Sequence, residues 1–108
     1  MKKVTTQSCN AFRLGYKFKK DNTEIKVDKL NKSFLLHGNE IGLIQNNILI
    51  IKDCQWKTLT TKERLNGILN EFNLPYRIVQ QKYKWFLLNI GNSFEKIEWE
   101  GKHEFKLI

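Results

Sequence analysis

The sequence predicts an α+β fold: a strongly twisted antiparallel meander of about eight or nine short strands, with one α-helix at about 60–73 packed on it. The segment 60–73 repeats its apolar residues with the period of an α-helix. Over most of the remaining chain, apolar and polar residues alternate, which is typical of half-buried strands. Short polar turns separate these runs, and they favour antiparallel neighbours over βαβ units.

The predicted helix has recognisable ends. Thr60 and Glu63 have the spacing of a capping box, in which each side chain accepts a hydrogen bond from the other residue's backbone N–H. Asn73 can adopt the left-handed conformation that ends many helices, and Pro75 cannot continue a helix. Between these ends, apolar residues fall at i, i+3, i+4 and i+7 and should form the buried stripe: Leu65, Ile68, Leu69 and Phe72.

Five strands are expected before the helix. Residues 1–10 are polar and basic and should be a loosely ordered lead-in, whereas 12–18 and 23–27 alternate with a period of two. Residues 48–51 are apolar at both parities, which predicts a central strand covered on both sides. Turns are expected at Lys20-Asp21-Asn22 and Gln45-Asn46-Asn47, and a tight hairpin is expected at Gly38-Asn39.

Four strands should follow Pro75, near 76–81, 83–90, 94–99 and 102–107. Residues 83–90 are apolar or aromatic on both faces except Lys84 and Asn89, so this strand should lie centrally. Turns are expected at Gly91-Asn92 and, for a last hairpin, at Glu100-Gly101.

The composition fits one domain spanning residues 1–108. A chain of 108 residues buries roughly two thirds of its unfolded surface, and 41% of this one is hydrophobic. No apolar run approaches the ~18 residues of a membrane span, and the N-terminus lacks the apolar centre of a secretion signal. Cys9 and Cys54 make no disulfide framework, which indicates a reducing compartment.

The charge is strongly and unevenly basic. Lysine and arginine number 19 against 11 acidic residues, for a net charge of +8, and residues 1–32 hold nine bases and three acids. Such asymmetry indicates an anionic partner, most often nucleic acid. The alternative is that the excess of lysine reflects the base composition of the genome and not binding of an anion. Sixteen bases are lysine, and asparagine and isoleucine each occur eleven times; all three share A/T-rich codons.

Two segments resemble a known group of proteins. Residues 35–42 (LLHGNEIG) and 56–66 (WKTLTTKERLN) are similar to small uncharacterised proteins encoded by bacteriophages and mobile elements of A/T-rich bacteria. The resemblance covers about a third of the chain and brings no activity, so no functional residue is carried over. It implies a phage-like accessory protein in the cytoplasm of a bacterial host, acting on nucleic acid or on a host enzyme.

Basic residues interleaved with aromatic ones are the candidate binding site. Lysine and arginine can neutralise phosphates, and an exposed ring can stack on bases for about 1–3 kcal/mol each. The alternative is that the rings pack in the core or at a sheet edge and that the lysines keep the protein soluble and resistant to aggregation. The candidates fall in an N-terminal and a C-terminal group: Arg13, Lys17, Lys19 and Lys20, and Arg77, Lys82, Tyr83, Lys84 and Trp85.

Catalytic and cofactor motifs are not recognisable. A ribonuclease can be built from two histidines and a lysine, so His37 and His103 are a possible acid–base pair. A histidine beside a turn or among apolar residues is more often a packing residue. The cysteines and histidines lack metal-ligand spacing, and the six glycines form no phosphate loop. We therefore expect no catalytic residue, metal or cofactor.

Three functions remain open. The leading hypothesis is a small, basic, non-enzymatic phage protein that contacts nucleic acid or a nucleic-acid-bearing complex. The second is an inhibitor of a host defence system, similar in action to an anti-CRISPR protein, that docks on a host protein through exposed strand edges. The third is a small metal-independent ribonuclease. None of them requires a membrane or a small-molecule cofactor.

Overall fold

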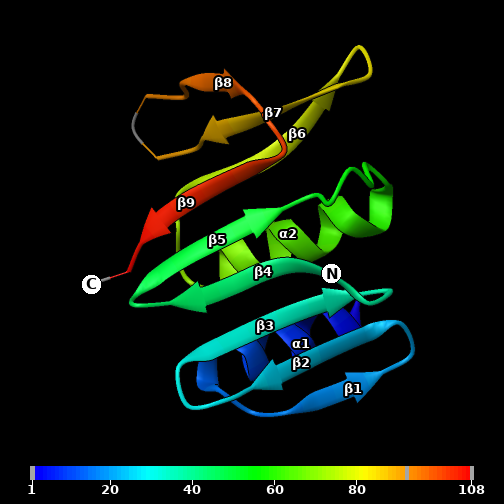
Figure 1. Cartoon of the computed structure of the whole chain (residues 1–108). Coiled ribbons are helices and arrows are strands. Elements are labelled where there is room, and N and C mark those ends of the chain that lie inside the picture. The colour runs from blue at the N-terminus through cyan, green and yellow to red at the C-terminus, as the bar shows by residue number, and fades with distance from the viewer. Residues whose placement is uncertain (1, 92, 108) are drawn as a thin grey trace.

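The computed structural model of the chain describes residues 2–91 and 93–107 (Figure 1). Within these residues it contains two helices and nine antiparallel strands in two sheets. The α+β class and the number of strands are confirmed, but the described chain has two helices rather than one. In order, the elements are α1 Lys3–Leu14, β1 Phe18–Lys20, β2 Thr23–Val27, β3 Asn31–Leu36, β4 Asn39–Gln45, β5 Ile48–Lys52, α2 Leu59–Glu71, β6 Tyr76–Gln81, β7 Lys84–Asn89, β8 Lys96–Glu98 and β9 Lys102–Lys106.

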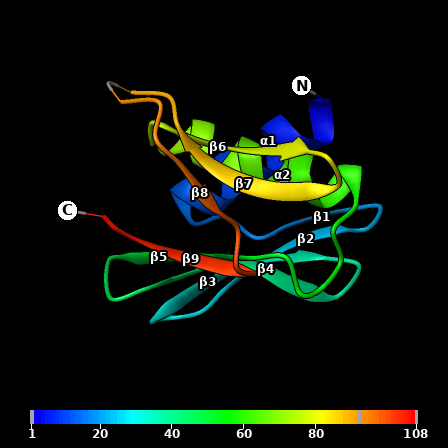
Figure 2. The same cartoon turned by 90° about the horizontal axis from the view of Figure 1, so that it is seen from above.

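The elements form two layers (Figure 2). One layer is a six-stranded sheet in the order β1-β2-β3-β4-β5-β9. Both helices and the three-stranded sheet β6-β7-β8 lie on one face of it. In the described part of the chain, no helix or strand covers the opposite face, which we call the outer face. Neither described helix is long and apolar enough to cross a membrane.

Helix α1 corrects two sequence predictions. The segment 1–10 was expected to be loosely ordered and 12–18 to be a strand, but residues 3–14 form a helix. Four of its buried residues have helical spacing: Thr5, Ser8, Cys9 and Phe12. Three of these residues are small, so the sequence shows no obvious apolar stripe. Gly15 ends the helix in the left-handed conformation, with φ +84°.

Helix α2 lies where a helix was predicted, with a different N-terminal cap. The N-cap is Thr58, whose Oγ1 accepts a hydrogen bond from the Thr61 N–H at 3.1 Å. The predicted capping box of Thr60 and Glu63 is therefore wrong, because the Glu63 carboxylate accepts hydrogen bonds from the Thr5 hydroxyl of α1 and from the Lys2 N–H just before this helix. Asn73 has the predicted left-handed φ, at +55°. The predicted stripe faces the core: Leu65, Ile68, Leu69 and Phe72.

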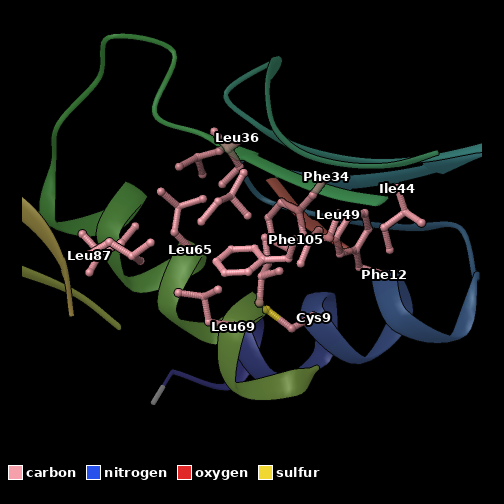
Figure 3. Packing of buried hydrophobic residues seen from close by; sticks show 14 of the residues in the cluster. Cys9, Phe12, Phe34, Leu36, Ile44, Leu49, Leu65, Leu69, Leu87 and Phe105 are labelled. Atoms are coloured by element: carbon pink, nitrogen blue, oxygen red, sulfur yellow. The ribbon is translucent and has the colours of Figure 1, made fainter. Parts of the chain in front are cut away.

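Both layers contribute to one hydrophobic cluster (Figure 3). Phe12 of α1 meets Phe34 of β3 edge to face, with ring centroids 5.6 Å apart. Gly42 of β4 lies where the helices press on the sheet: a Cβ there would come within 3.2 Å of Ile68 and of Phe34. Glycine at this position allows the helices to approach the sheet closely.

Two-residue turns connect several of the strands. Asp21-Asn22 and Asn46-Asn47 lie within two of the predicted turns, each of which was one residue too long, because Lys20 and Gln45 are paired in strands. The third predicted turn is displaced by one residue, to His37-Gly38, because Leu36 pairs with Asn39. His37 and Gly38 both have positive φ, as this type of turn requires. The turn predicted at Gly91-Asn92 includes Asn92, which lies outside the described residues.

The predicted last hairpin at Glu100-Gly101 is wrong. Strand β8 pairs with β7 in the small sheet, whereas β9 crosses over and pairs with β5 in the large one. Trp99 holds this crossing: its buried indole Nε1 donates to Asp53 Oδ2 at 2.8 Å, and its backbone N–H donates to the Trp85 carbonyl. Gly101, with φ +94°, then redirects the chain into β9.

A buried arginine joins three elements. The Arg64 guanidinium of α2 is 4% exposed and donates to Thr5 Oγ1 of α1. It also donates to Thr23 Oγ1 of β2 at 3.3 Å and to Glu63 Oε1 at 2.8 Å. Thr5 Oγ1 in turn donates to the same Glu63 oxygen at 3.0 Å. The carboxylate and two hydroxyls thus compensate a charge that burial would otherwise penalise.

We expect Arg64→Ala to lower the free energy of unfolding by about 3–5 kcal/mol, because it removes one partner of a buried ion pair and leaves two hydroxyls without their donor. Urea denaturation followed by circular dichroism measures this change. Lys29→Ala, at an exposed loop position, is the control and should change stability by less than about 0.5 kcal/mol. Equal effects of the two substitutions would contradict a structural role of the network.

Candidate nucleic-acid interface

Three lysines meet on the outer face at the β1–β2 edge of the large sheet. Phe18 and Ile25 are paired residues turned toward the core. Because residues alternate between the faces of a strand, Lys19 and Lys26 lie on the outer face. Lys17, just before β1, lines the same shallow groove of about 590 Å³. Two of these residues belong to the predicted site, and Lys26 was missed.

The groove is cationic although it contains two carboxylates. Glu24 is opposite Lys19 in the β1–β2 ladder, and Asp28 lies at the end of β2. The Asp28 carboxylate accepts hydrogen bonds from the Leu30 and Asn31 N–H groups, which hold its pKa below its usual value. Among the described residues, no carboxylate oxygen lies within 4 Å of the ammonium groups of the three lysines, so their charges are open to an external anion.

The centre of the outer face is aliphatic. Strand β5 is interior to the sheet, as predicted, but it is not covered on both sides, because both helices lie on the other face. Its outward residues are partly exposed, together with those of β3 and β4: Leu35, Leu43, Ile48 and Ile50. These side chains offer no ring, so base stacking must come from elsewhere.

The other two residues of the N-terminal group lie apart from the groove. Arg13 is on α1 and forms an ion pair with Glu71 of α2, with 2.6 Å between Nε and Oε2. Lys20 is exposed at the end of β1, but it pairs with Thr23, whose side chain is buried, and so has the opposite parity to Lys19. Of these four residues, which were predicted to share or adjoin one strand face, Lys17 and Lys19 lie together on the outer face.

The C-terminal group is centred on the β6–β7 hairpin. Lys82 and Tyr83 form its two-residue turn, with φ of +49° and +69°. This turn favours Asn-Gly, and positive φ is costly for a bulky residue such as tyrosine. Tyr83 is 94% exposed, and Lys84 beside it is exposed too. The hairpin therefore presents an aromatic ring flanked by two lysines to the solvent.

Arg77 and Trp85 have structural contacts. The Arg77 guanidinium donates to the carbonyls of Leu74 and Tyr76 and to Asn70 Oδ1, which ties β6 to helix α2. Trp85 is 3% exposed and belongs to the core cluster, so its ring is not accessible for stacking.

The two candidate groups do not form one surface. The β6–β7 hairpin and strand β1 lie at opposite ends of the molecule in Figure 1. They also belong to different sheets. A single ligand site can therefore include the groove lysines or the hairpin, and we treat them separately.

The histidines considered for acid–base chemistry line different pockets. His37 lies at the β3–β4 turn with its Nε2 3.1 Å from the Asn22 amide nitrogen. His103 packs against Phe105, with ring centroids 4.8 Å apart, and lines a pocket beside β8. The geometry therefore gives no support to a shared reaction centre. Within the described residues, no three histidine, cysteine, aspartate or glutamate side chains are grouped to hold a metal ion.

A pocket of about 470 Å³ between the β3–β4 turn and the start of α2 was not predicted from the sequence. Trp56 lines it and is 60% exposed, in contrast to the buried Trp85 and Trp99. One signal was present in the sequence: Trp56 stands in a largely polar segment, 52–58, in which Cys54 is the other apolar residue. Such an aromatic residue has no evident place in the core.

The fold and these surfaces define a small basic α+β protein with one uncovered sheet face. The family model of the Kyanoviridae Gp96 protein matches residues 1–106, so the chain belongs to this phage protein family. No curated protein and no solved structure matches the chain.

We expect replacement of Lys82-Tyr83 by Asn-Gly to raise the free energy of unfolding by about 0.5–2 kcal/mol, because these residues adopt positive φ more readily. Thermal and urea denaturation measure the gain. Replacement of the neighbouring pair Gln80-Gln81 by Thr-Thr, on the exposed end of β6, is the control and should have a much smaller effect. An unchanged or lower stability of the Asn-Gly variant would show that this turn is not strained.

We expect the two cysteines to differ in reactivity at pH 8. Burial raises the pKa of the Cys9 thiol to about 12, and Cys9 is 1% exposed. Burial also raises the pKa of Cys54, but this residue is partly exposed. Because the thiolate is the reactive form, both thiols should react more slowly than free cysteine. Cys54 should react in the folded protein, and Cys9 should react only after unfolding. Ellman's reagent measures this, and Cys54→Ser should abolish the native-state reaction.

Proposed function

We propose that this phage protein is a non-enzymatic nucleic-acid-binding protein that uses the groove at the β1–β2 edge of its outer face. The observation that carries the proposal is the group Lys17, Lys19 and Lys26, three ammonium groups on an uncovered sheet face with no carboxylate within 4 Å among the described residues. The net charge of +8 supports it, since the field of the whole protein attracts a polyanion before contact.

The mechanism is electrostatic. Each lysine that contacts a phosphate releases counterions from the nucleic acid, which makes affinity fall with salt. Lysine supplies a point charge rather than the bidentate geometry of arginine, so the groove should position a phosphate backbone without reading a base sequence.

We expect binding of fluorescently labelled oligonucleotides to weaken linearly in log affinity against log salt. The variant Lys17→Gln, Lys19→Gln, Lys26→Gln should bind all sequences more weakly and reduce the salt slope by roughly 2 for single strands, about 0.7 for each phosphate that is no longer neutralised. Fluorescence anisotropy over a series of salt concentrations measures both quantities.

The matched control is Lys3→Gln, Lys82→Gln, Lys84→Gln, which removes the same charge from exposed residues on α1 and on the β6–β7 hairpin. It should retain most of the affinity and most of the salt slope. If both variants lose affinity equally, net charge rather than the groove accounts for binding. Affinity that does not change with salt would eliminate the electrostatic mechanism.

A second candidate function is docking on a host protein, as an inhibitor of host defence would do. The observation that favours it is the exposed Tyr83 at the tip of the β6–β7 hairpin, because tyrosine is enriched among the residues that dominate protein interfaces. Affinity capture from host lysate with and without nuclease distinguishes the two functions. A partner that survives nuclease and is lost with Tyr83→Ser would favour docking, whereas loss of every partner on nuclease treatment would favour nucleic-acid binding.

A further inference from the structure

The pocket beside Trp56 has the size and lining of a ligand site. Its volume of about 470 Å³ falls within the roughly 300–1,000 Å³ of small-molecule sites. Its apolar lining consists of the exposed Trp56 indole and the buried side chains of Leu36 and Ile41, and the Asn39 amide and the Thr60 hydroxyl supply polar atoms. In the part of the chain that the structure describes, neither polar side chain makes a hydrogen bond, so both are free to bind a ligand.

The loop that carries Trp56 is held in place before any ligand binds. Asp53, which is 3% exposed, accepts from the Gln55 N–H through Oδ1 and from the Trp99 indole through Oδ2, each at 2.8 Å. The Trp56 N–H donates to the Asp53 carbonyl at 2.8 Å. Cys54 and Gln55 both have positive φ, which non-glycine residues seldom adopt. The backbone that carries the indole is therefore tied by hydrogen bonds to the buried Asp53.

A third hollow lies between the lysine groove and the Trp56 pocket and shares lining residues with each. This hollow is at the β1–β2 turn, and it shares Lys19 and Glu24 with the groove. The same hollow shares His37 with the Trp56 pocket. The three hollows thus follow one another around the turn end of the large sheet, from its outer face to the start of α2. The middle hollow also contains the carboxylates of Asp21 and Glu24, so the cationic charge is confined to the groove end. We call this series of three hollows the strand track.

The two ends of the strand track differ in chemistry, and each suits a different part of a nucleotide. The groove end offers ammonium groups, which suit phosphates. The pocket end offers an exposed indole, an amide that can both donate and accept, and a hydroxyl, which suit a planar base with donor and acceptor groups at its edge. A base can enter such a concave pocket when it is unstacked, as in single strands.

We infer that the strand track binds single-stranded nucleic acid, with the phosphate backbone over Lys17, Lys19 and Lys26 of the groove and one unstacked base in the pocket against Trp56. This inference rests on the proposed function and adds to it the class of nucleic acid and a base-binding pocket. Asn39 and Thr60 hydrogen-bond the edge of the base, and duplexes bind more weakly because their bases are stacked and paired.

Tryptophan fluorescence tests the inference, because Trp85 and Trp99 are 3% and 5% exposed and a bound base can quench Trp56 selectively. Titration with mixed-sequence single-stranded 12-mers should quench the emission, and the corresponding duplex should not. Trp56→Leu should abolish the quenching and weaken single-strand binding roughly fivefold to a hundredfold, with the salt slope unchanged. Trp56→Phe should lose the quenching and keep most of the affinity, because phenylalanine retains a stacking ring.

The outcomes separate the two levels of the proposal. Anisotropy that shows binding sensitive to Lys17→Gln, Lys19→Gln, Lys26→Gln, but unaffected by Trp56→Leu, would overturn the base pocket and leave the proposed function standing. Absence of any nucleic-acid binding would overturn both. A nucleoside monophosphate that quenches Trp56 with the affinity of the oligonucleotide would show a site for free nucleotides and overturn the strand track. Unchanged thermal unfolding of Trp56→Leu, an exposed position, verifies that the variant is folded.

Discussion

The guanidinium of Arg64 lies where α1, α2 and β2 meet, and the arrangement of the helical layer depends on it. Its partners Thr5 and Thr23 come from different elements, and Glu63 supplies the compensating carboxylate. An unpaired buried charge costs several kcal/mol. The position of α2 in which Arg64 makes these hydrogen bonds is therefore strongly preferred over shifted positions in which it would lose them. A small residue lets the two helices lie close together at this point. The Cys9 thiol of α1 contacts the Arg64 carbonyl of α2 at 3.9 Å.

With both helices on one face, the large sheet is left with an uncovered face and exposed ends. Most of the apolar side chains of the sheet face the helices, and the outer face keeps a central aliphatic patch with lysines along its edges. The turns at one end of the sheet meet the loop that leads into α2, which creates the hollows there. The proposed binding surfaces are thus a consequence of the two-layer arrangement.

The local patterns of the sequence predicted much of the strand order along the chain and helix α2. Alternation and turn residues placed β2, β5 and β7 well, because each has neighbours that bury a regular set of apolar side chains. Helix α1 was missed because its buried positions carry Thr5, Ser8 and Cys9, which do not register as an apolar stripe. The crossing from β8 to β9 was missed because it depends on the contact of Trp99 with Asp53, 46 residues away.

The sequence alone determined the α+β class, the basic charge and the presence of lysines and aromatic rings that could bind an anion, because these follow from composition and local periodicity. Only the tertiary structure decided which of those residues share a surface. It buried Trp85, exposed Tyr83 and Trp56, and separated the hairpin lysines from Lys17 and Lys19. The physical reason is that strand parity and turn type are local properties, whereas the face of a sheet that stays open depends on where distant helices pack.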